Sequence, residues 1–187
     1  SAELYYNDYS LENAPKRDGA VRLIRALQAQ GIPVARIGTQ EHNKKDWPTA
    51  AQVDSTIPAF AATGDKVMVT ELDVDVLPRA TGSQGPEVST RIAGNAALNP
   101  YAAGLPDSVQ QALAARYAEL FRVYLKHRDA ISRVTFWNVT DRESWLNDWP
   151  VPGRTSYPLL FDREGRPKPA FDAVVRVGRE AAAAGNR

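Results

Sequence analysis

The stretch at residues 67–76, VMVTELDVDV, constrains the fold more than any other part of the chain. Its first residues are apolar and follow Gly64, and such a run is typical of a parallel strand that is covered on both faces. Two carboxylates, Glu71 and Asp73, then appear where the strand should end. Because the active sites of β/α barrels gather at the carboxyl ends of their strands, this pattern predicts an α/β fold with a catalytic acid at that end.

Length and charge narrow the possibilities further. The chain has 187 residues, of which 43% are hydrophobic and 24% charged, and this predicts one globular unit over residues 1–187. A net charge of +1 gives no electrostatic field that would attract nucleic acid or an anionic membrane, so we expect neither as a partner. No run of about 18 apolar residues predicts a membrane span, and the first residues do not read as a signal peptide. The lack of cysteine excludes disulfides and thiolate chemistry.

Four strand–helix units follow one another along the chain. Strands are predicted at 4–9, 32–38, 67–73 and 131–139 from their apolar and aromatic residues. The first helix ends at Gly31, and the second begins near Ser55, so that Pro58 falls in its first turn. The third helix follows Pro106 and ends in a basic cluster, and the fourth runs from about Pro169 to Gly185.

Under the right-handed crossover rule, four such units give a four-stranded parallel sheet covered by helices. A doubly wound sheet usually carries a glycine-rich phosphate turn, and neither GxGxxG nor GxxxxGK is present. A complete barrel needs eight units and typically about 250 residues, so the chain has the size of half a barrel. The long connection at 77–104, rich in glycine and proline, is predicted to be a loop on the substrate side.

Polar and aromatic side chains follow each predicted strand. Glu71 has the chemistry of a carboxylate nucleophile, which must be ionised and held still by hydrogen bonds from groups such as an imidazole and an amide. Asp73 shares a strand face with Glu71, and we expect it to bond the far nitrogen of His42. Indole rings pack well on the faces of sugar rings. The complete candidate set is Asn7, Tyr9, Gln40, His42, Glu71, Asp73, Trp137 and Trp145.

Four motifs in order, YYNDYSLE from Tyr5, GTQEH from Gly38, VTELDV from Val69 and TFWNVTDRESW from Thr135, resemble the C-terminal half of glycoside hydrolase family 10, the endo-β-1,4-xylanases. The resemblance implies a (βα)4 half of a TIM (β/α)8 barrel, namely strands five to eight with their helices. It also implies retaining hydrolysis of xylan without a cofactor or metal.

The resemblance also implies roles for individual residues. Glu71 matches the nucleophile, and His42, with Asp73 in support, matches the histidine that orients it. Gln40 matches a group beside the reacting sugar, and Asn7 and Tyr9 match contacts on the leaving-group side. Trp137 and Trp145 match sugar-stacking tryptophans. Ser10 stands where an asparagine is common and Asn138 where a glycine is common, and we expect both to be tolerated.

One departure affects function directly. The acid/base glutamate of the family lies at the end of the fourth strand in an asparagine–glutamate pair, and this chain contains no such pair. We therefore expect that hydrolysis needs the missing N-terminal half of the barrel or a homodimer partner, and that the isolated chain is inactive or very weak. Xylan or xylo-oligosaccharides are the expected substrates, and a polymeric plant-wall substrate implies a secreted or periplasmic enzyme.

Other interpretations of the same residues stay open. The chain could be a truncated, non-catalytic half-barrel that self-associates and at most binds sugar weakly. Considered alone, Glu71 could form a structural salt bridge, and the tryptophans could be core residues. A metal-dependent hydrolase would use His42, Asp73 and Asp75, but no second histidine lies nearby in the sequence.

Overall fold

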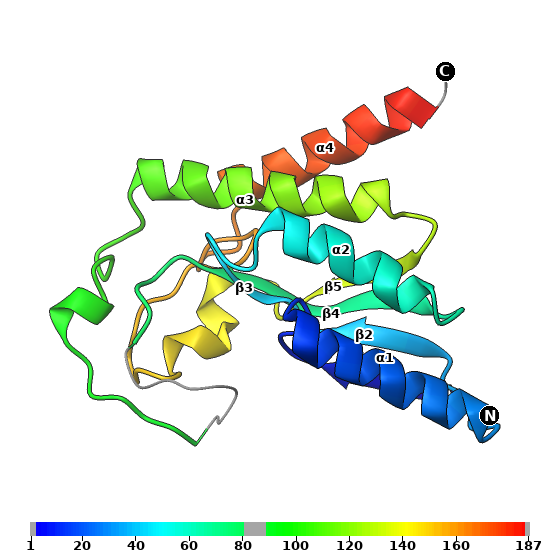
Figure 1. Cartoon of the computed structure of the whole chain (residues 1–187). Coiled ribbons are helices and arrows are strands. Elements are labelled where there is room, and N and C mark those ends of the chain that lie inside the picture. Colours follow the sequence, from blue (N-terminus) through cyan, green and yellow to red (C-terminus); the bar gives the residue numbers. More distant parts are fainter. Residues whose placement is uncertain (1–2, 81–88, 186–187) are drawn as a thin grey trace. The chain divides into compact units, whose positions relative to one another are not determined.

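The computed structural model describes residues 3–80 and 89–185, a βα-type chain (Figure 1). Its strands are β1 (Tyr5–Asp8), β2 (Arg36–Thr39), β3 (His42–Lys44), β4 (Lys66–Asp75) and β5 (Ile131–Phe136). Its α-helices are α1 (Ala14–Ala29), α2 (Ala50–Ala61), α3 (Asp107–Lys126) and α4 (Pro169–Gly185). Short 3-10 helices lie at Ala96–Leu98, Asp141–Glu143 and Trp145–Asn147.

The four predicted strands correspond to β1, β2, β4 and β5, and they pair in parallel in chain order. Tyr5 pairs with Arg36, Arg36 with Lys66, and Val67 with Ile131. Each strand is thus hydrogen-bonded to the next along the chain, which is the connectivity of consecutive units of a β/α barrel. The short strand β3, which joins the sheet beside β4, was not predicted from the sequence.

The chain divides into two compact units. One unit comprises the residues up to Leu72 together with Glu119–Phe136, and the other comprises Asp73–Ala118 and the residues from Trp137 onward. The elements β4 and α3 contribute residues to both.

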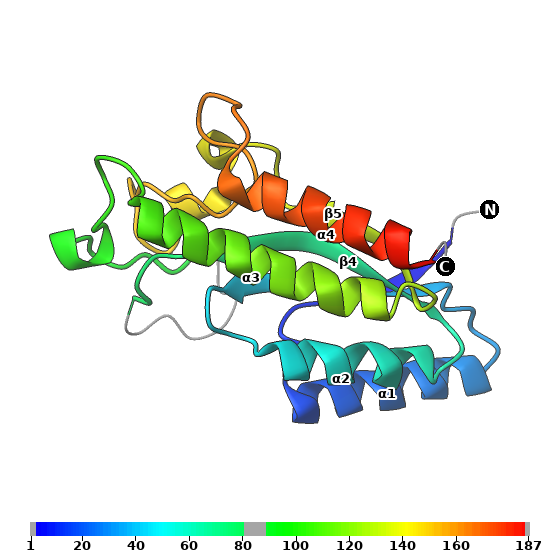
Figure 2. The ribbon, with the colours of Figure 1, turned by 90° about the horizontal axis from the view of Figure 1, so that it is seen from above.

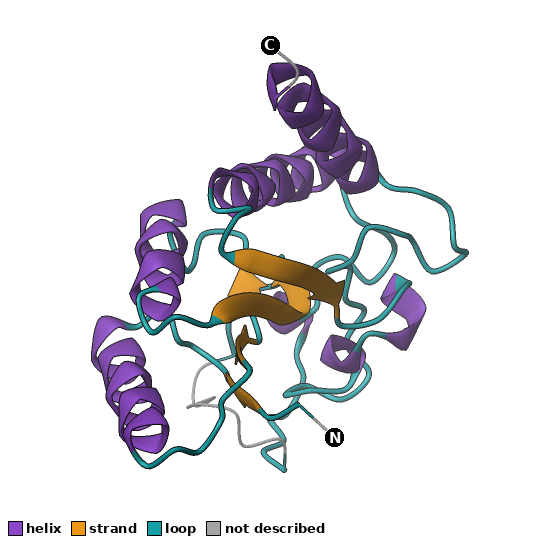
Figure 3. Ribbon diagram, turned by 90° about the vertical axis from the view of Figure 1, so that its right-hand side faces the viewer, coloured by secondary structure: helices purple, strands orange, loops and turns teal. Residues whose placement is uncertain are grey.

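In the first unit, α1 and α2 lie side by side, as Figures 1 and 2 show, and in Figure 3 both lie outside the strands. Each helix buries apolar side chains: Ile24 of α1 and Val53 and Phe60 of α2 are fully buried. Burial of such a side chain contributes about 1.5–3 kcal/mol to stability. On the sheet, Ile37, Val67, Val69 and Leu72 are fully buried.

The predicted start of α2 is wrong. The helix begins at Ala50, five residues before Ser55, because Thr49 and Gln52 form a capping box in which each side chain bonds the backbone N–H of the other. Pro58 consequently lies in the helix interior and not in its first turn. An interior proline costs about 3 kcal/mol, a cost that the burial of Val53, Ile57 and Phe60 offsets.

The other predicted helices are confirmed. Helix α1 is capped at its N-terminus by Asn13. Gly31 follows the helix with a φ of 74°, which is the left-handed cap that the sequence predicts at this residue. Helices α3 and α4 begin and end close to the predicted positions. In residues 3–80 and 89–185, no helix is long and apolar enough to cross a membrane.

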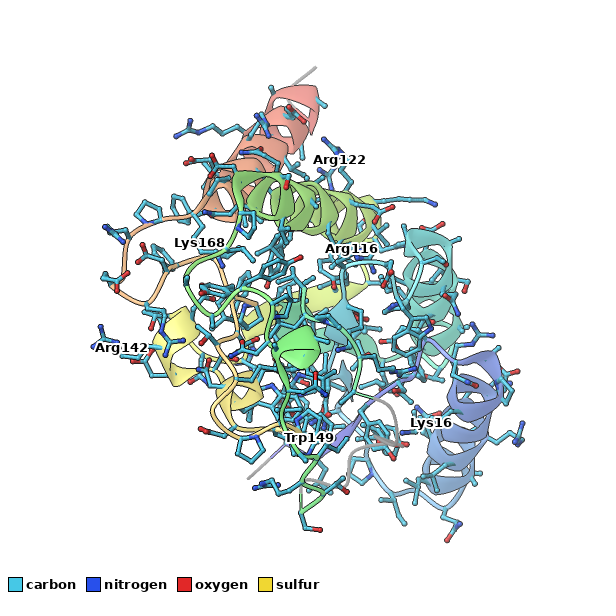
Figure 4. The ribbon with its side chains drawn as sticks, turned by 90° about the vertical axis from the view of Figure 1, so that its left-hand side faces the viewer. Lys16, Arg116, Arg122, Arg142, Trp149 and Lys168 are labelled. Carbon is cyan, nitrogen blue, oxygen red and sulfur yellow. The ribbon has the colours of Figure 1, made fainter. Side chains whose placement is uncertain are left out.

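In the second unit, α4 packs through Phe171 on Phe161, whose ring centroid lies 5.2 Å away. The residue before α4, Lys168 (labelled in Figure 4), forms a buried ion pair of 2.8 Å with Asp141 and also donates to the carbonyl of Tyr157. Burial raises the pKa of Asp141 to about 6 and lowers the pKa of Lys168. The desolvation of the two charges therefore outweighs their mutual attraction.

Candidate active site

The carboxylate of Glu71 is held at both oxygens by side chains from two other strands. The Nδ2 atom of Asn7, on β1, donates to Oε1 across 3.1 Å, and Nε2 of His42, on β3, lies 3.2 Å from Oε2. The Glu71 side chain is 15% exposed and the His42 side chain 22%, so both reach solvent. Three predicted site residues thus meet at the strand ends, as expected for a parallel sheet.

The main chain also fixes Glu71. Its N–H donates to the carbonyl of Gln40 across 3.0 Å, and the N–H of Gln40 donates to the carbonyl of Asp8. Gln40 therefore links the end of β1 to β4 through its backbone. The predicted role of its side chain as a sugar contact stays a prediction.

The amide of Asn7 is oriented by a residue that the sequence did not single out. The hydroxyl of Thr70 donates to Asn7 Oδ1 across 2.8 Å, which leaves the NH2 group facing Glu71. Gly38 makes room for this amide, since a Cβ at residue 38 would lie 2.5 Å from Asn7 Oδ1. A glycine inside a predicted strand is the one local signal of such a close approach.

A cation supports the segment after β1. Lys16 of α1, labelled in Figure 4, donates to Asp8 across 2.8 Å and lies over the ring of Tyr9, 3.2 Å from its centroid. Burial alone would raise the pKa of Asp8, but hydrogen bonds from Lys16, from the Tyr9 N–H and from Tyr6 lower it. Asp8 is thus an ionised anchor, and Lys16 positions the predicted substrate contact Tyr9.

Three of the predicted site residues, Asp73, Trp137 and Trp145, belong to the second unit. The indole N–H of Trp145 donates to Asp73 Oδ2 across 2.8 Å, and the Trp145 ring stacks on Trp149 at 4.8 Å between centroids. Trp149, which is labelled in Figure 4, was not among the predicted site residues. The indole of Trp137 is 43% exposed. The predicted bond between Asp73 and His42 stays a prediction.

The geometry of Glu71 fits nucleophilic chemistry. The amide of Asn7 donates to one carboxylate oxygen, and Nε2 of His42 lies within hydrogen-bonding distance of the other, so both oxygens are held in place. Within the part of the chain that the structure describes, no three histidine, cysteine or acidic residues cluster closely enough to hold a metal ion. A parallel β/α sheet with a carboxyl group held at the carboxyl end of a strand is the active-site arrangement of β/α-barrel enzymes.

Comparison with known proteins agrees with this class. The family model of glycosyl hydrolase family 10 matches residues 1–177, so the chain belongs to that family. Endo-1,4-beta-xylanase A of Xylanibacter ruminicola is 43% identical over 176 residues, which are 94% of this chain and 48% of that protein.

Solved structures give the same result. A GH10 endoxylanase retrieved from a sugarcane soil metagenome superposes with a TM-score of 0.90 at 45% identity, over 94% of this chain and 51% of that one. A structure described as a complex with xylotriose has a TM-score of 0.77 at 29% identity, over 92% of this chain and 48% of that one. The chain spans about half the length of the relatives it matches, and its fold is the (βα)4 half of a (β/α)8 barrel.

Proposed function

We propose that this chain supplies the nucleophile half of a retaining endo-1,4-β-xylanase site. The observation that carries the proposal is the carboxylate of Glu71, whose two oxygens each have a hydrogen-bonding partner, Asn7 or His42. The relatives named xylanases, and the one described with xylotriose, support xylan or xylo-oligosaccharides as the substrate class.

In the first step, Glu71 attacks the anomeric carbon and forms a glycosyl–enzyme ester while the bond to the leaving oxygen breaks. The leaving oxygen takes a proton from a general acid. In the second step, water attacks the anomeric carbon, gives a proton to the conjugate base of that acid and releases Glu71. His42 and Asn7 hold the nucleophile in place through its two oxygens, and Asp73 supports this arrangement as a positioning residue.

The remaining predicted residues would bind the sugar chain. Trp137, exposed, and Trp145 present indole rings suited to stacking on xylose units. Asn7 and Tyr9 would contact the leaving-group side, and Gln40 the reacting sugar. A polymeric substrate places the working enzyme outside the cytoplasm, in a secreted or periplasmic location.

The general acid must come from another polypeptide segment, because the asparagine–glutamate pair is not in this sequence. The missing N-terminal half of the barrel, or a second copy of the chain, would bring its strands beside β1 and β5. Apolar residues at the start of β1 favour such a partner, since Leu4 is 56% and Tyr5 44% exposed. Alone, the chain would hydrolyse xylan very weakly or not at all.

Covalent labelling tests the assignment. A mechanism-based xylobioside inactivator is added to the chain mixed with the N-terminal half of a family member, and the modified peptide is located by mass spectrometry. We expect one sugar per chain, attached at Glu71, and none in E71Q. Attachment to any other residue would overturn the role of Glu71.

The same mixture distinguishes this proposal from the alternative of a non-catalytic half-barrel. It predicts no covalent sugar and no reducing-sugar release from xylan, even with the N-terminal half present. Sedimentation of the chain alone tests the homodimer. A monomer at micromolar concentration would leave the N-terminal half as the partner.

A further inference from the structure

Two acidic side chains that the proposed mechanism does not use lie buried together in the first unit. Glu12, in the segment between β1 and α1, is 3% exposed, and Glu41, between Gln40 and His42, is 2% exposed. Glutamate is almost never buried in this way without a partner. The question is what compensates the two carboxyls.

The contacts of Glu41 come from neutral groups. Its Oε2 accepts from Asn43 Nδ2 at 2.9 Å and from the Tyr124 hydroxyl of α3 at 3.2 Å. The Thr39 hydroxyl lies 3.5 Å from Glu41 Oε1 and 3.3 Å from Glu12 Oε1. Among the described residues, the groups that act on the Glu41 carboxyl are these three and Glu12, and none of them is a cation.

The number of available protons determines how Glu12 and Glu41 can both form a hydrogen bond with Thr39. Thr39 has one hydroxyl proton, so it can donate to only one of the two carboxyls, and an ionised carboxylate can only accept. The second contact is a hydrogen bond only if one of the carboxyls carries a proton. Burial, and then the negative charge of Glu12, raise the pKa of Glu41 well above its ordinary range, in agreement with this count.

Glu41 is mechanically linked to the candidate nucleophile. Its backbone has a φ of 62°, a left-handed conformation that costs a non-glycine residue on the order of 1–3 kcal/mol. The two residues next to Glu41 in the chain both contact Glu71. The carbonyl of Gln40 accepts from the Glu71 N–H, and the ring of His42 lies against the Glu71 carboxylate. The contacts of the buried Glu41 side chain therefore act on the turn that carries both of these groups.

We propose that Glu12 and Glu41 share one proton and, as positioning residues, hold the segment from Gln40 to His42 against Glu71. This inference rests on the proposed function only for the importance of Glu71. The shared proton and the position of His42 are properties of the folded chain, and both can be measured without hydrolysis.

The proton is tested by infrared spectroscopy of the chain at neutral pH. We expect the carbonyl band of a protonated carboxylic acid in the unmodified chain. In E12Q the band should shift in frequency, because Glu41 stays buried but loses its acidic partner, and in the double variant E12Q/E41Q the band should be lost. D141N is the control, which should keep the band, since Asp141 is a second buried acid whose pKa is raised. No band in the unmodified chain, a band with the same frequency in E12Q, or a band that survives in the double variant would overturn the shared proton.

The positioning role is tested by ¹⁵N NMR of the imidazoles, of which the chain has two, His42 and His127. In E41A we expect the His42 signals to shift while His127, which lies 2.7 Å from Asp54, stays unchanged as an internal control. E41Q, which keeps the size and most hydrogen bonds, should restore the His42 signals. If E41A does not fold, Y124F removes one donor to Glu41 and should shift His42 in the same direction.

A His42 signal that is unchanged in the folded variant, or a shift that His127 shares equally, would overturn the positioning role. Because neither measurement depends on turnover, these outcomes are independent of the labelling of Glu71. A failed labelling experiment would remove the proposed function but not the shared proton.

Discussion

The indole N–H of Trp145 donates to the Oδ2 atom of Asp73 across 2.8 Å. Asp73 is 1% exposed, so the indole satisfies part of a buried acid. This bond couples a ring predicted to bind sugar to the strand β4. A change at Trp145 should therefore affect stability as well as sugar binding.

Replacing Trp145 by phenylalanine keeps an aromatic ring but removes the donor. We expect W145F to lower the free energy of unfolding by about 1–3 kcal/mol, the usual cost of leaving a buried polar group without its partner. Urea unfolding followed by circular dichroism measures it. W47F, at an indole that is 36% exposed, should change stability by no more than about 0.5 kcal/mol. Equal losses in the two variants would contradict the role of the Asp73 bond.

Gly38 leaves no room for a side chain. We expect G38A to displace the amide of Asn7, to destabilise the chain by about 1–3 kcal/mol and to slow labelling of Glu71 about tenfold or more. The control is G178A in α4, where a Cβ meets nothing within 4 Å and alanine should stabilise the helix by about 0.5–1 kcal/mol. A G38A chain that is labelled at the unmodified rate would show that Asn7 does not need this space.

Ser10 has a φ of 51°, in the left-handed region where asparagine and glycine are favoured. We expect S10N to stabilise the chain by a few tenths of a kcal/mol up to about 1 kcal/mol. G31A, at a φ of 74° with open space around it, should destabilise by a similar amount. Thermal unfolding of the two variants and of the unmodified chain measures whether stability rises in S10N and falls in G31A. A loss of stability in S10N would contradict the backbone explanation.

The buried pair of Lys168 and Asp141 should be sensitive to the loss of one partner. K168M leaves a carboxylate without its cation inside the second unit, and we expect a destabilisation of about 3–5 kcal/mol at neutral pH. Adding D141N to K168M should recover part of that loss. Urea unfolding of the two single variants and the double variant gives the coupling. Strictly additive losses would show that the two groups do not interact.

Asp141 also predicts a pH dependence. Its pKa is about 6 in the folded chain, above the ordinary value of 3.8, so the stabilisation that it contributes is complete below pH 3.8 and is lost as the pH rises through 6. The free energy of unfolding of the unmodified chain should therefore fall relative to that of D141N as the pH rises from 4 to 7. A difference that is constant over this interval would contradict the raised pKa.

Local pattern was sufficient to predict most of the fold. Apolar runs and glycines located the strands β1, β2, β4 and β5, and three of the four helices, because burial and capping act on neighbouring residues. The predicted start of α2 near Ser55 rested on Pro58 alone, whereas the capping box of Thr49 and Gln52 starts the helix at Ala50. The short strand β3 carries no apolar run and depends on its pairing in the sheet.

The candidate site was predicted in part for a similar reason. Glu71, His42 and Asn7 occupy motif positions at strand ends, and the structure brings them together. Thr70 and Lys16 were missed because their contacts depend on side-chain direction in the folded chain, which the sequence pattern does not give. The buried pairing of Glu12 with Glu41 joins two segments that only folding brings together.

The parallel register described above also governs how the chain can fold. The pairs β1–β2, β2–β4 and β4–β5 cannot close as hairpins, since each of these parallel pairings spans a whole crossover connection. The pairing of β4 with β5 joins residues roughly twice as far apart in the chain as those joined by β1 with β2 or by β2 with β4. Chain entropy therefore favours early assembly of β1, β2 and β4 with their two helices, so the strand that carries Glu71 is set before β5 docks.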